Sequence, residues 1–89
     1  MDMNVVVEIK VMPEGTEIKM ETINEEIKEI VNNYGKFHSS EIKPVAFGLK
    51  SLEVKILLND KKGGLEEIEK KISTLKGVQG VEITNFTLI

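Results

Sequence analysis

The residue types that most readily do chemistry in this sequence stand together as His38-Ser39-Ser40-Glu41. A nucleophilic serine needs a histidine base, and the histidine needs a carboxylate that orients it. Neighbouring residues on a strand point to opposite faces, however, so this order is expected to separate the three side chains. One histidine without clustered ligands does not make a metal site either. We therefore expect His38 to be a surface residue, and we predict no catalytic residue and no metal ligand.

Two pairs of adjacent glutamates, Glu25-Glu26 and Glu66-Glu67, offer candidate acid and base groups. Adjacent residues diverge by about 100° around a helix axis, so neither pair can converge on one substrate atom. Both pairs lie opposite apolar stripes and are expected to be solvated helix faces. No reaction is indicated, and the protein is not expected to be an enzyme.

The segment Asp60-Lys61-Lys62-Gly63-Gly64 has the appearance of a phosphate loop that enters a helix. It lacks the spacing of a P-loop and has no Ser or Thr after a Gly-Lys pair. We predict a turn here, and no cofactor.

The amino-acid composition limits the classes of molecule that this protein is expected to bind. The chain has 89 residues, no cysteine and a net charge of -3, and all 12 of its basic residues are lysine. Arginine makes the bidentate contacts to phosphate and guanine, so its absence argues against a nucleic-acid-binding protein. No apolar run approaches the roughly 20 residues that span a bilayer, and the first residues carry no basic signal region. A single domain over residues 1–89 and a cytoplasmic location are expected, with no membrane contact.

The elements that position these residues follow from periodicity. Residues 5–11 alternate as a strand, and a helix with Thr16 as its cap is predicted to end at residues 32–35. A weaker strand over residues 37–42 ends at Pro44, which has no N–H for a ladder bond. The first helix is indicated by apolar residues at helical spacing: Met20, Ile23, Ile27, Ile30 and Val31.

The second half repeats this order. Residues 51–58 alternate cleanly, an amphipathic helix runs from Leu65 to Leu75, and Gly77 is a natural stop. A last strand begins at residues 81–84, and Phe86 and Leu88 then continue on the opposite parity. That switch indicates a bulge near Asn85, or a segment that leaves the sheet.

The predicted fold is therefore α+β, a ferredoxin-like β-α-β-β-α-β sandwich with a four-stranded antiparallel sheet and two helices on one face. An RNA-recognition domain of this topology needs aromatic residues on the open face of the sheet. Here the open face is expected to carry charged residues instead, which argues against that class: Glu8, Lys10, Glu53, Lys55 and Glu82. The helix-covered face is expected to carry Val5, Val7, Ile9, Leu52, Val54, Ile56, Val81 and Ile83.

The connection between the second and third strands is unusual because it is apolar. Residues 43–49 read Lys-Pro-Val-Ala-Phe-Gly-Leu, where a polar, exposed loop is the norm. Such a loop either folds back onto its own core or is kept for a partner. Composition alone favours the core for Phe47.

The run from Pro44 to Leu52, followed by residues 57–60 and then Gly63-Gly64, resembles the archaeal elongation factor 1-beta family. The opening at residues 9–14 and the ending at residues 77–83 look like the same family, so the resemblance covers essentially the whole chain. It implies a ferredoxin-like fold and a monomeric factor that exchanges GDP for GTP on the GTPase elongation factor 1-alpha. It also implies that Phe47 presses into the GTPase near the nucleotide, with Pro44 and Gly48 shaping the loop. The partner-binding residues expected on this basis are Pro44, Val45, Phe47, Gly48, Lys50, Leu88 and Ile89.

One departure from the family stands at the carboxyl terminus. Eukaryotic members place a lysine next to the end of the chain, where it perturbs the magnesium site of the GTPase, whereas Leu88 stands there here. Exchange would then rely on the loop, or on another residue such as Lys50. The alternative from a different class is a ferredoxin-like regulatory module that senses a small molecule as a homodimer.

Overall fold

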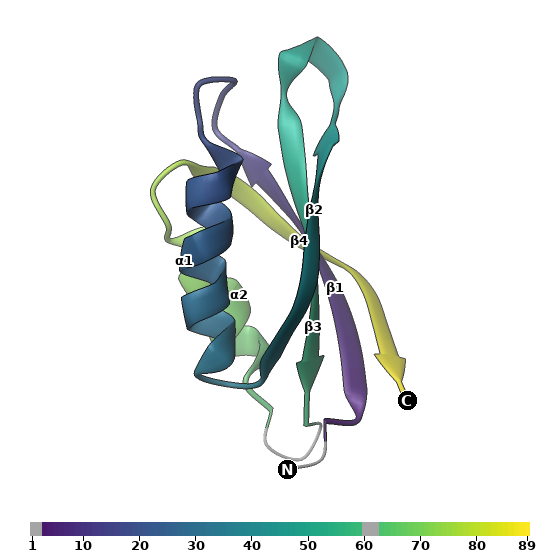
Figure 1. The fold of residues 1–89 in the computed structure, drawn as a ribbon. Helices are drawn as coiled ribbons and strands as arrows, with labels where there is room; N and C mark the ends of the chain where they lie inside the picture. The colour runs from purple at the N-terminus through teal and green to yellow at the C-terminus, as the bar shows by residue number, and fades with distance from the viewer. Residues whose placement is uncertain (1–2, 60–62) are drawn as a thin grey trace.

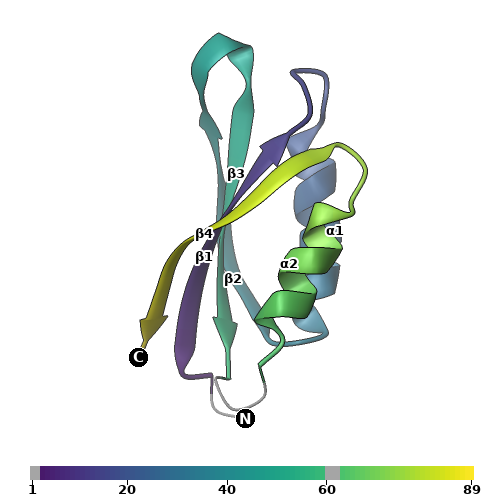
Figure 2. The same ribbon diagram turned by 180° about the vertical axis from the view of Figure 1, so that it is seen from behind.

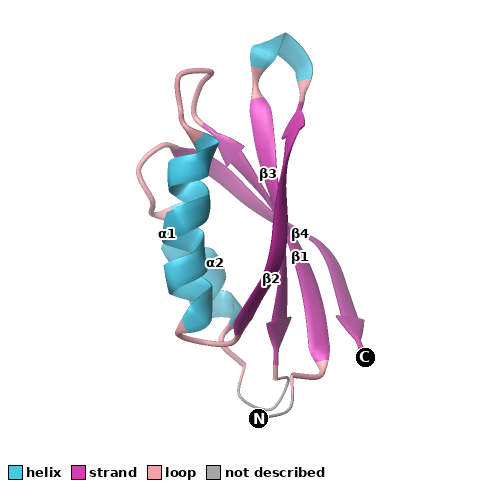
Figure 3. Ribbon diagram, in the orientation of Figure 1, coloured by secondary structure: helices cyan, strands magenta, loops and turns pink. Residues whose placement is uncertain are grey.

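The order of elements confirms the predicted β-α-β-β-α-β arrangement (Figures 1 and 3). The structure is a computed structural model that describes residues 3–59 and 63–89. A short 3-10 turn at Ala46–Gly48 joins the second and third strands of the chain. The elements are β1 (Val5–Pro13), α1 (Met20–Asn32), β2 (Lys36–Pro44), β3 (Lys50–Leu58), α2 (Leu65–Ser73) and β4 (Val78–Leu88).

The four strands form one antiparallel sheet in the order β2-β3-β1-β4. Both helices lie on one face of it, and the other face is uncovered (Figures 1 and 2). This is the predicted ferredoxin-like α+β fold. Because β3 and β4 both run antiparallel to β1, the start of β3 and the end of β4 lie at opposite ends of the sheet.

Alternation along the strands builds the core. Every second residue of β1, beginning at Val5, is buried, and the residues between them are partly exposed. The same period runs through β3 from Leu52 to Leu58. Facing them, each helix contributes a stripe at helical spacing, namely Met20, Ile23, Ile27, Val31, Ile68 and Ile72. The sequence therefore placed the helix-covered face correctly.

Two helix boundaries differ from the prediction. Thr16 is not a helix cap, because α1 begins at Met20 with Lys19 in the capping position and no side-chain cap bond. The helix α2 ends at Ser73, and Leu75 packs against the core from the turn that follows. Both errors are of a few residues, at ends where tertiary packing rather than capping chemistry sets the boundary.

The edge strand β4 contains the bulge that the parity switch predicted. Ile83 pairs with Ile9 but Asn85 pairs with Glu8, so Thr84 is an extra residue. The Thr84 hydroxyl donates to the Glu8 carbonyl at 3.2 Å, and the Asn85 amide donates to the Glu8 carboxylate at 2.9 Å. The strand then continues to Leu88, so the alternative of a segment that leaves the sheet is wrong.

In the part of the chain that the structure describes, neither helix is long and apolar enough to cross a membrane.

Candidate partner-binding site

The connection between β2 and β3 is a tight hairpin that projects from one end of the molecule (Figure 1). Pro44 and Lys50 form the last pair of the ladder. Beyond them the Val45 N–H donates to the Leu49 carbonyl at 2.8 Å, and the Leu49 N–H donates to the Ala46 carbonyl at 3.3 Å. These bonds close the hairpin over three residues, so its tip has a defined backbone.

Phe47 occupies the tip and is 95% exposed. The interpretation that this side chain packs onto the core is therefore wrong, because the tip stands beyond the end of the sheet. Only Val45 and Leu49, at the base of the loop, are half-buried. A large apolar side chain presented to solvent from a closed hairpin is a candidate anchor for a partner.

The backbone of Phe47 is also strained. Its φ of 63° and ψ of 30° lie in the left-handed region, and no other described residue except glycine has a positive φ. For a residue with a Cβ this conformation costs roughly 1 kcal/mol. Local strain at an exposed aromatic side chain indicates that the conformation serves a purpose other than stability.

Gly48 continues the same left-handed turn with a φ of 77°, which glycine adopts without penalty. A Cβ at this position would meet Thr16 Cγ2 at 3.7 Å, so the hairpin lies beside the β1–α1 loop. Between them is a groove of about 210 Å³ lined by both apolar and charged groups. Lys50 lines it from the hairpin, and Glu17 and Lys19 line it from the other loop.

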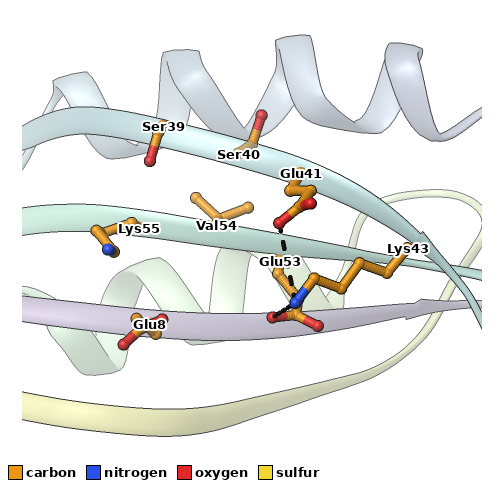
Figure 4. A pocket seen from close by; sticks show the side chains of 8 residues that line it. All are labelled: Glu8, Ser39, Ser40, Glu41, Lys43, Glu53, Val54 and Lys55. Carbon is orange, nitrogen blue, oxygen red and sulfur yellow. Dashed lines mark ion pairs between the residues drawn. The ribbon is translucent and has the colours of Figure 1, made fainter.

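The uncovered face of the sheet carries both acidic and basic side chains (Figure 4). The Lys43 ammonium lies 3.4 Å from a carboxylate oxygen of Glu53 and 3.8 Å from one of Glu41. These ion pairs link β2 and β3 at the base of the hairpin. A shallow hollow of about 320 Å³ runs along these residues toward Glu8 and Lys55. Among the described residues, no three His, Cys, Asp or Glu side chains are placed to hold a metal ion.

His38 and Ser39 meet, contrary to the expectation that strand alternation separates them. The register of β2 shifts between Phe37 and Ser39, and this bulge brings His38 Nδ1 to 3.0 Å from the Ser39 hydroxyl. Both residues are exposed, and within residues 3–59 and 63–89 no carboxylate hydrogen-bonds to His38. A base without an orienting carboxylate does not make a nucleophilic site.

The predicted turn at residues 60–64 falls partly outside the described residues, which exclude Asp60, Lys61 and Lys62. Gly63 and Gly64 are described, and both have positive φ, 69° and 103°. A left-handed pair of glycines before a helix agrees with the turn that was predicted.

The predicted partner-binding residues fall into two groups. Pro44, Val45, Phe47, Gly48 and Lys50 share the hairpin, whereas Leu88 and Ile89 lie at the end of β4 (Figure 2). Leu88 pairs with Val5, at the far end of β1 from the hairpin. At about 3.3 Å per residue along the strands, the two groups are roughly 30 Å apart, in a molecule whose longest dimension is 40 Å.

Sequence reasoning left Phe86 out of the candidate residues. It lies two positions before Leu88 on the same face and is 54% exposed. The sequence did contain a signal for Phe86, namely the change of parity between Ile83 and Phe86. A bulge there keeps Phe86 and Leu88 together on the face that carries Val7 and Val5.

Comparison with known proteins shows one family that matches nearly the whole chain. Residues 6–89 match the model of the EF-1 guanine nucleotide exchange domain. A protein of Methanothermobacter thermautotrophicus named "Elongation factor 1-beta" is 37% identical over 82 residues, which is 92% of each chain. The protein of the same name from Thermoplasma volcanium is 33% identical over 86 residues, which cover 97% of this chain and 98% of that one.

Solved structures with a similar fold are more distant. The ACT domain from GTP pyrophosphokinase of Chlorobium tepidum superposes with a TM-score of 0.61 at 16% identity, covering 90% of this chain and 97% of that one. The C-terminal domain of the MgtC protein from Mycobacterium tuberculosis gives a TM-score of 0.62 at 14% identity, covering 100% of this chain and 92% of that one. At these identities the likeness concerns the fold alone.

Proposed function

The chain belongs to the family of EF-1 guanine nucleotide exchange domains, and on that premise we propose that it promotes GDP release and GTP reloading on elongation factor 1-alpha. The relatives that carry the name "Elongation factor 1-beta" match nearly the whole chain, which supports the same role. The alternative of a small-molecule-sensing module is supported only by a fold-level likeness to an ACT domain.

Exchange of this kind needs no bond to be made or broken. A factor that weakens GDP binding to the GTPase is itself weakened by GDP to the same extent, because the coupling between two ligands is reciprocal. The factor must therefore bind the nucleotide-free conformation better than the GDP-bound one. The protein acts as a ligand rather than as an enzyme, and it requires no cofactor.

The observation that carries the proposal is the exposed, left-handed Phe47 at the tip of the hairpin. A partner pocket that buries this ring gains about 1.5–3 kcal/mol from removing its surface from water. The closed hairpin fixes the backbone that carries the ring before binding, so little backbone entropy is lost on association. Gly48 allows the turn, and Pro44 and Val45 support its base.

Lys50, next to the anchor, adds charge to this contact. It is exposed, and no ion pair within the described residues involves it. A cation at the rim of an interface raises the association rate more than the affinity. We assign Lys50 a steering role toward acidic groups on the GTPase.

Leu88 and Ile89 form a second contact on the same partner. Roughly 30 Å separates them from Phe47 by strand geometry, so the two groups cannot enter one pocket. The GTPase surface must therefore extend along the sheet, and Phe47 alone acts at the hairpin end.

The remaining properties follow from the same role. Residues 1–89 act as one exchange domain in the cytoplasm, and the free protein is a monomer. It binds the GTPase directly, without nucleic acid and without a membrane.

Release of a fluorescent GDP from purified elongation factor 1-alpha tests the proposal. The wild-type protein, in the presence of excess unlabelled nucleotide, is expected to accelerate release by orders of magnitude over the spontaneous rate. The ratio of GDP affinities with and without the factor should equal the ratio of factor affinities with and without GDP. A release rate that does not depend on the concentration of the factor contradicts the proposal.

A further inference from the structure

The strand β4 leaves one edge of the sheet open. In the order β2-β3-β1-β4 it pairs with β1 alone, so the backbone groups along its other side face no neighbouring strand of the described chain. Such groups can pair with an extended segment of another polypeptide. The ladder of β4 is regular over residues 80–83, between bulges at Gln79 and Thr84. This stretch is the part of the edge best suited to pairing.

The other edge of the sheet is protected. The strand β2 carries Lys36 and Lys43 and ends at Pro44. Lysine and proline on an edge strand oppose pairing with a further strand. Residues 78–89 contain neither residue type. Of the two edges, the one formed by β4 is therefore the one open to strand addition.

A groove lies between this edge and the helix α2, which packs against β4 (Figure 2). Its volume is about 570 Å³. The helix lines it with Glu66, Glu69, Lys70 and Ser73, and β4 lines it from residues 79–81. An extended segment paired with β4 would lie along this groove, with the side chains of one of its faces against α2.

The apolar residues of the edge are incompletely covered. Val81 and Ile83 are only half-buried. Their partners in β1 are Val11 and Ile9, respectively, and both of these are fully buried. A further strand next to β4 would remove the remaining apolar surface of Val81 and Ile83 from water, which favours its addition.

Among the described residues that line the groove or lie on β4, carboxylates outnumber ammonium groups. Glu66, Glu69 and Lys70 bring charge to the groove. Glu82 is exposed on β4 and pairs with Lys10, which places it on the uncovered face. None of these side chains forms an ion pair within the described residues. An added strand alternates its side chains between the two faces, so basic residues on either face would lie beside a carboxylate.

We propose that the edge of β4 and the groove beside α2 bind an extended segment of a partner polypeptide, bearing lysine or arginine, by strand addition. Main-chain hydrogen bonds to residues 80–83 hold the segment, and its alternate side chains lie against α2 and beside Glu82. The site is at the opposite edge of the sheet from β2 and its hairpin. It does not depend on the exchange role.

A second copy of the chain is disfavoured as the occupant. Pairing of two β4 edges about a two-fold axis sets the same surface of each copy against the other. The carboxylates of Glu66, Glu69 and Glu82 would then face an equally acidic surface, and like charges on adjacent strands are destabilising. A basic segment meets opposite charges instead.

The test uses a fluorescein-labelled peptide of nine residues in which lysine and valine alternate, and measures its binding to the full chain by fluorescence anisotropy. The double variant Glu66→Gln with Glu69→Gln is expected to weaken binding about 10-fold. Glu26→Gln with Glu29→Gln is the matched control, because it removes the same charge at the same spacing from exposed positions of α1. It should bind the peptide as the wild type does, and thermal unfolding confirms that both variants are folded.

A second peptide separates strand addition from attraction by charge. It has the same composition, but its lysines and valines stand in two blocks, so it cannot alternate along the groove. Strand addition predicts that it binds at least about 10-fold more weakly. Equal binding of the two peptides, or equal weakening by the two double variants, would reduce the effect to the net charge of the protein and overturn the proposal.

Hydrogen exchange locates the contact. With the alternating peptide bound, amides within residues 78–83 should exchange about 10-fold more slowly, because backbone pairing protects them. Protection along β2 instead, or no protection in β4, overturns the proposal, as does a wild type that sediments as a dimer and shows the same protection without peptide. None of these measurements involves the GTPase, so their outcome is separate from that of the proposed function.

Discussion

The two ends of the sheet expose apolar side chains in opposite ways. At the hairpin, one aromatic ring projects from a left-handed turn, and lysines at positions 43 and 50 flank it. At the end of β4, three apolar side chains lie on a regular strand, without a charged residue from position 83 onward. The first arrangement suits a single inserted anchor with electrostatic steering, whereas the second offers apolar side chains without backbone strain and without neighbouring charged side chains.

The difference has its origin in the sheet. The hairpin has to reverse direction in three residues, which requires positive φ at Phe47 and Gly48 and lifts the ring away from the core. The end of β4 keeps its extended conformation and diverges from both helices, which leaves its side chains exposed (Figures 1 and 2). Among the described residues, backbone strain therefore marks the hairpin and not the end of β4.

Removal of the ring is the strongest way to test this contrast. Phe47→Ala should weaken binding to nucleotide-free elongation factor 1-alpha by about 2–3 kcal/mol, or roughly 30- to 140-fold, because a buried aromatic anchor is lost. Since the ring is 95% exposed in the free protein, the free energy of unfolding should change by no more than about 0.5 kcal/mol. Surface plasmon resonance and urea unfolding measure the two quantities.

Phe47→Leu serves as the control for that change. It keeps an apolar side chain on the same backbone and should retain part of the affinity. If Phe47→Ala instead destabilises the protein as much as it weakens binding, the ring is a structural element and the contrast between the ends fails.

A variant that changes both ends of the sheet tests whether the two contacts act independently. The triple variant, Phe47→Ala with Leu88→Ser and Ile89→Ser, should lose the sum of the two binding free energies within about 0.5 kcal/mol, since sites more than 10 Å apart are usually independent. A double-mutant cycle from measured dissociation constants gives the coupling. A coupling well above 1 kcal/mol would indicate that the two contacts form cooperatively rather than as separate anchors.

Gly48 tests whether the turn geometry matters. A Cβ here would make only ordinary contact with Thr16, but alanine at φ 77° costs roughly 1 kcal/mol. Gly48→Ala should therefore lower the exchange efficiency about 5-fold by displacing Phe47, with a fall of about 1 kcal/mol in unfolding free energy. Gly80→Ala, a position with open space around its Cβ and no positive φ, is the control and should leave exchange unchanged.

Substitution of Lys50 is expected to have the smallest effect on binding. It also distinguishes the two ends of the sheet, because only the contact at the hairpin should depend on salt. Lys50→Glu should slow association about 3- to 5-fold at low salt and by less at high salt, because screening weakens a rim charge. Stopped-flow association at several salt concentrations measures this. If Lys50→Glu instead changes the dissociation rate, and by the same factor at every salt concentration, Lys50 makes a buried contact with the partner.

Much of the fold could be predicted because its signals are local. Alternation in β1 and β3 and the apolar stripes of both helices set the core, and the parity change at Asn85 located the bulge. The predicted start of α1 was wrong because Thr16 has the chemistry of a cap but lies in a turn three residues before the observed capping position, Lys19. Capping residues are frequent in turns, so residue type alone does not separate the two.

The site was predicted less completely. The exposure of Phe47 depends on a left-handed backbone that residue type does not reveal, and composition pointed to the core. The separation of the two ends follows from topology alone, because β3 and β4 run in the same direction. The encounter of His38 with Ser39 depends on a bulge in β2 that the sequence did not indicate.

The most direct test of the central claim, that the hairpin tip is the main anchor on the GTPase, compares exchange by two proteins in one experiment. Fluorescent GDP release from elongation factor 1-alpha is followed with equal, subsaturating concentrations of the wild type and Phe47→Ala. Rapid release with the wild type and a rate at least 30-fold lower with Phe47→Ala is the predicted result. Equal release rates from the two folded proteins would contradict the assignment of Phe47.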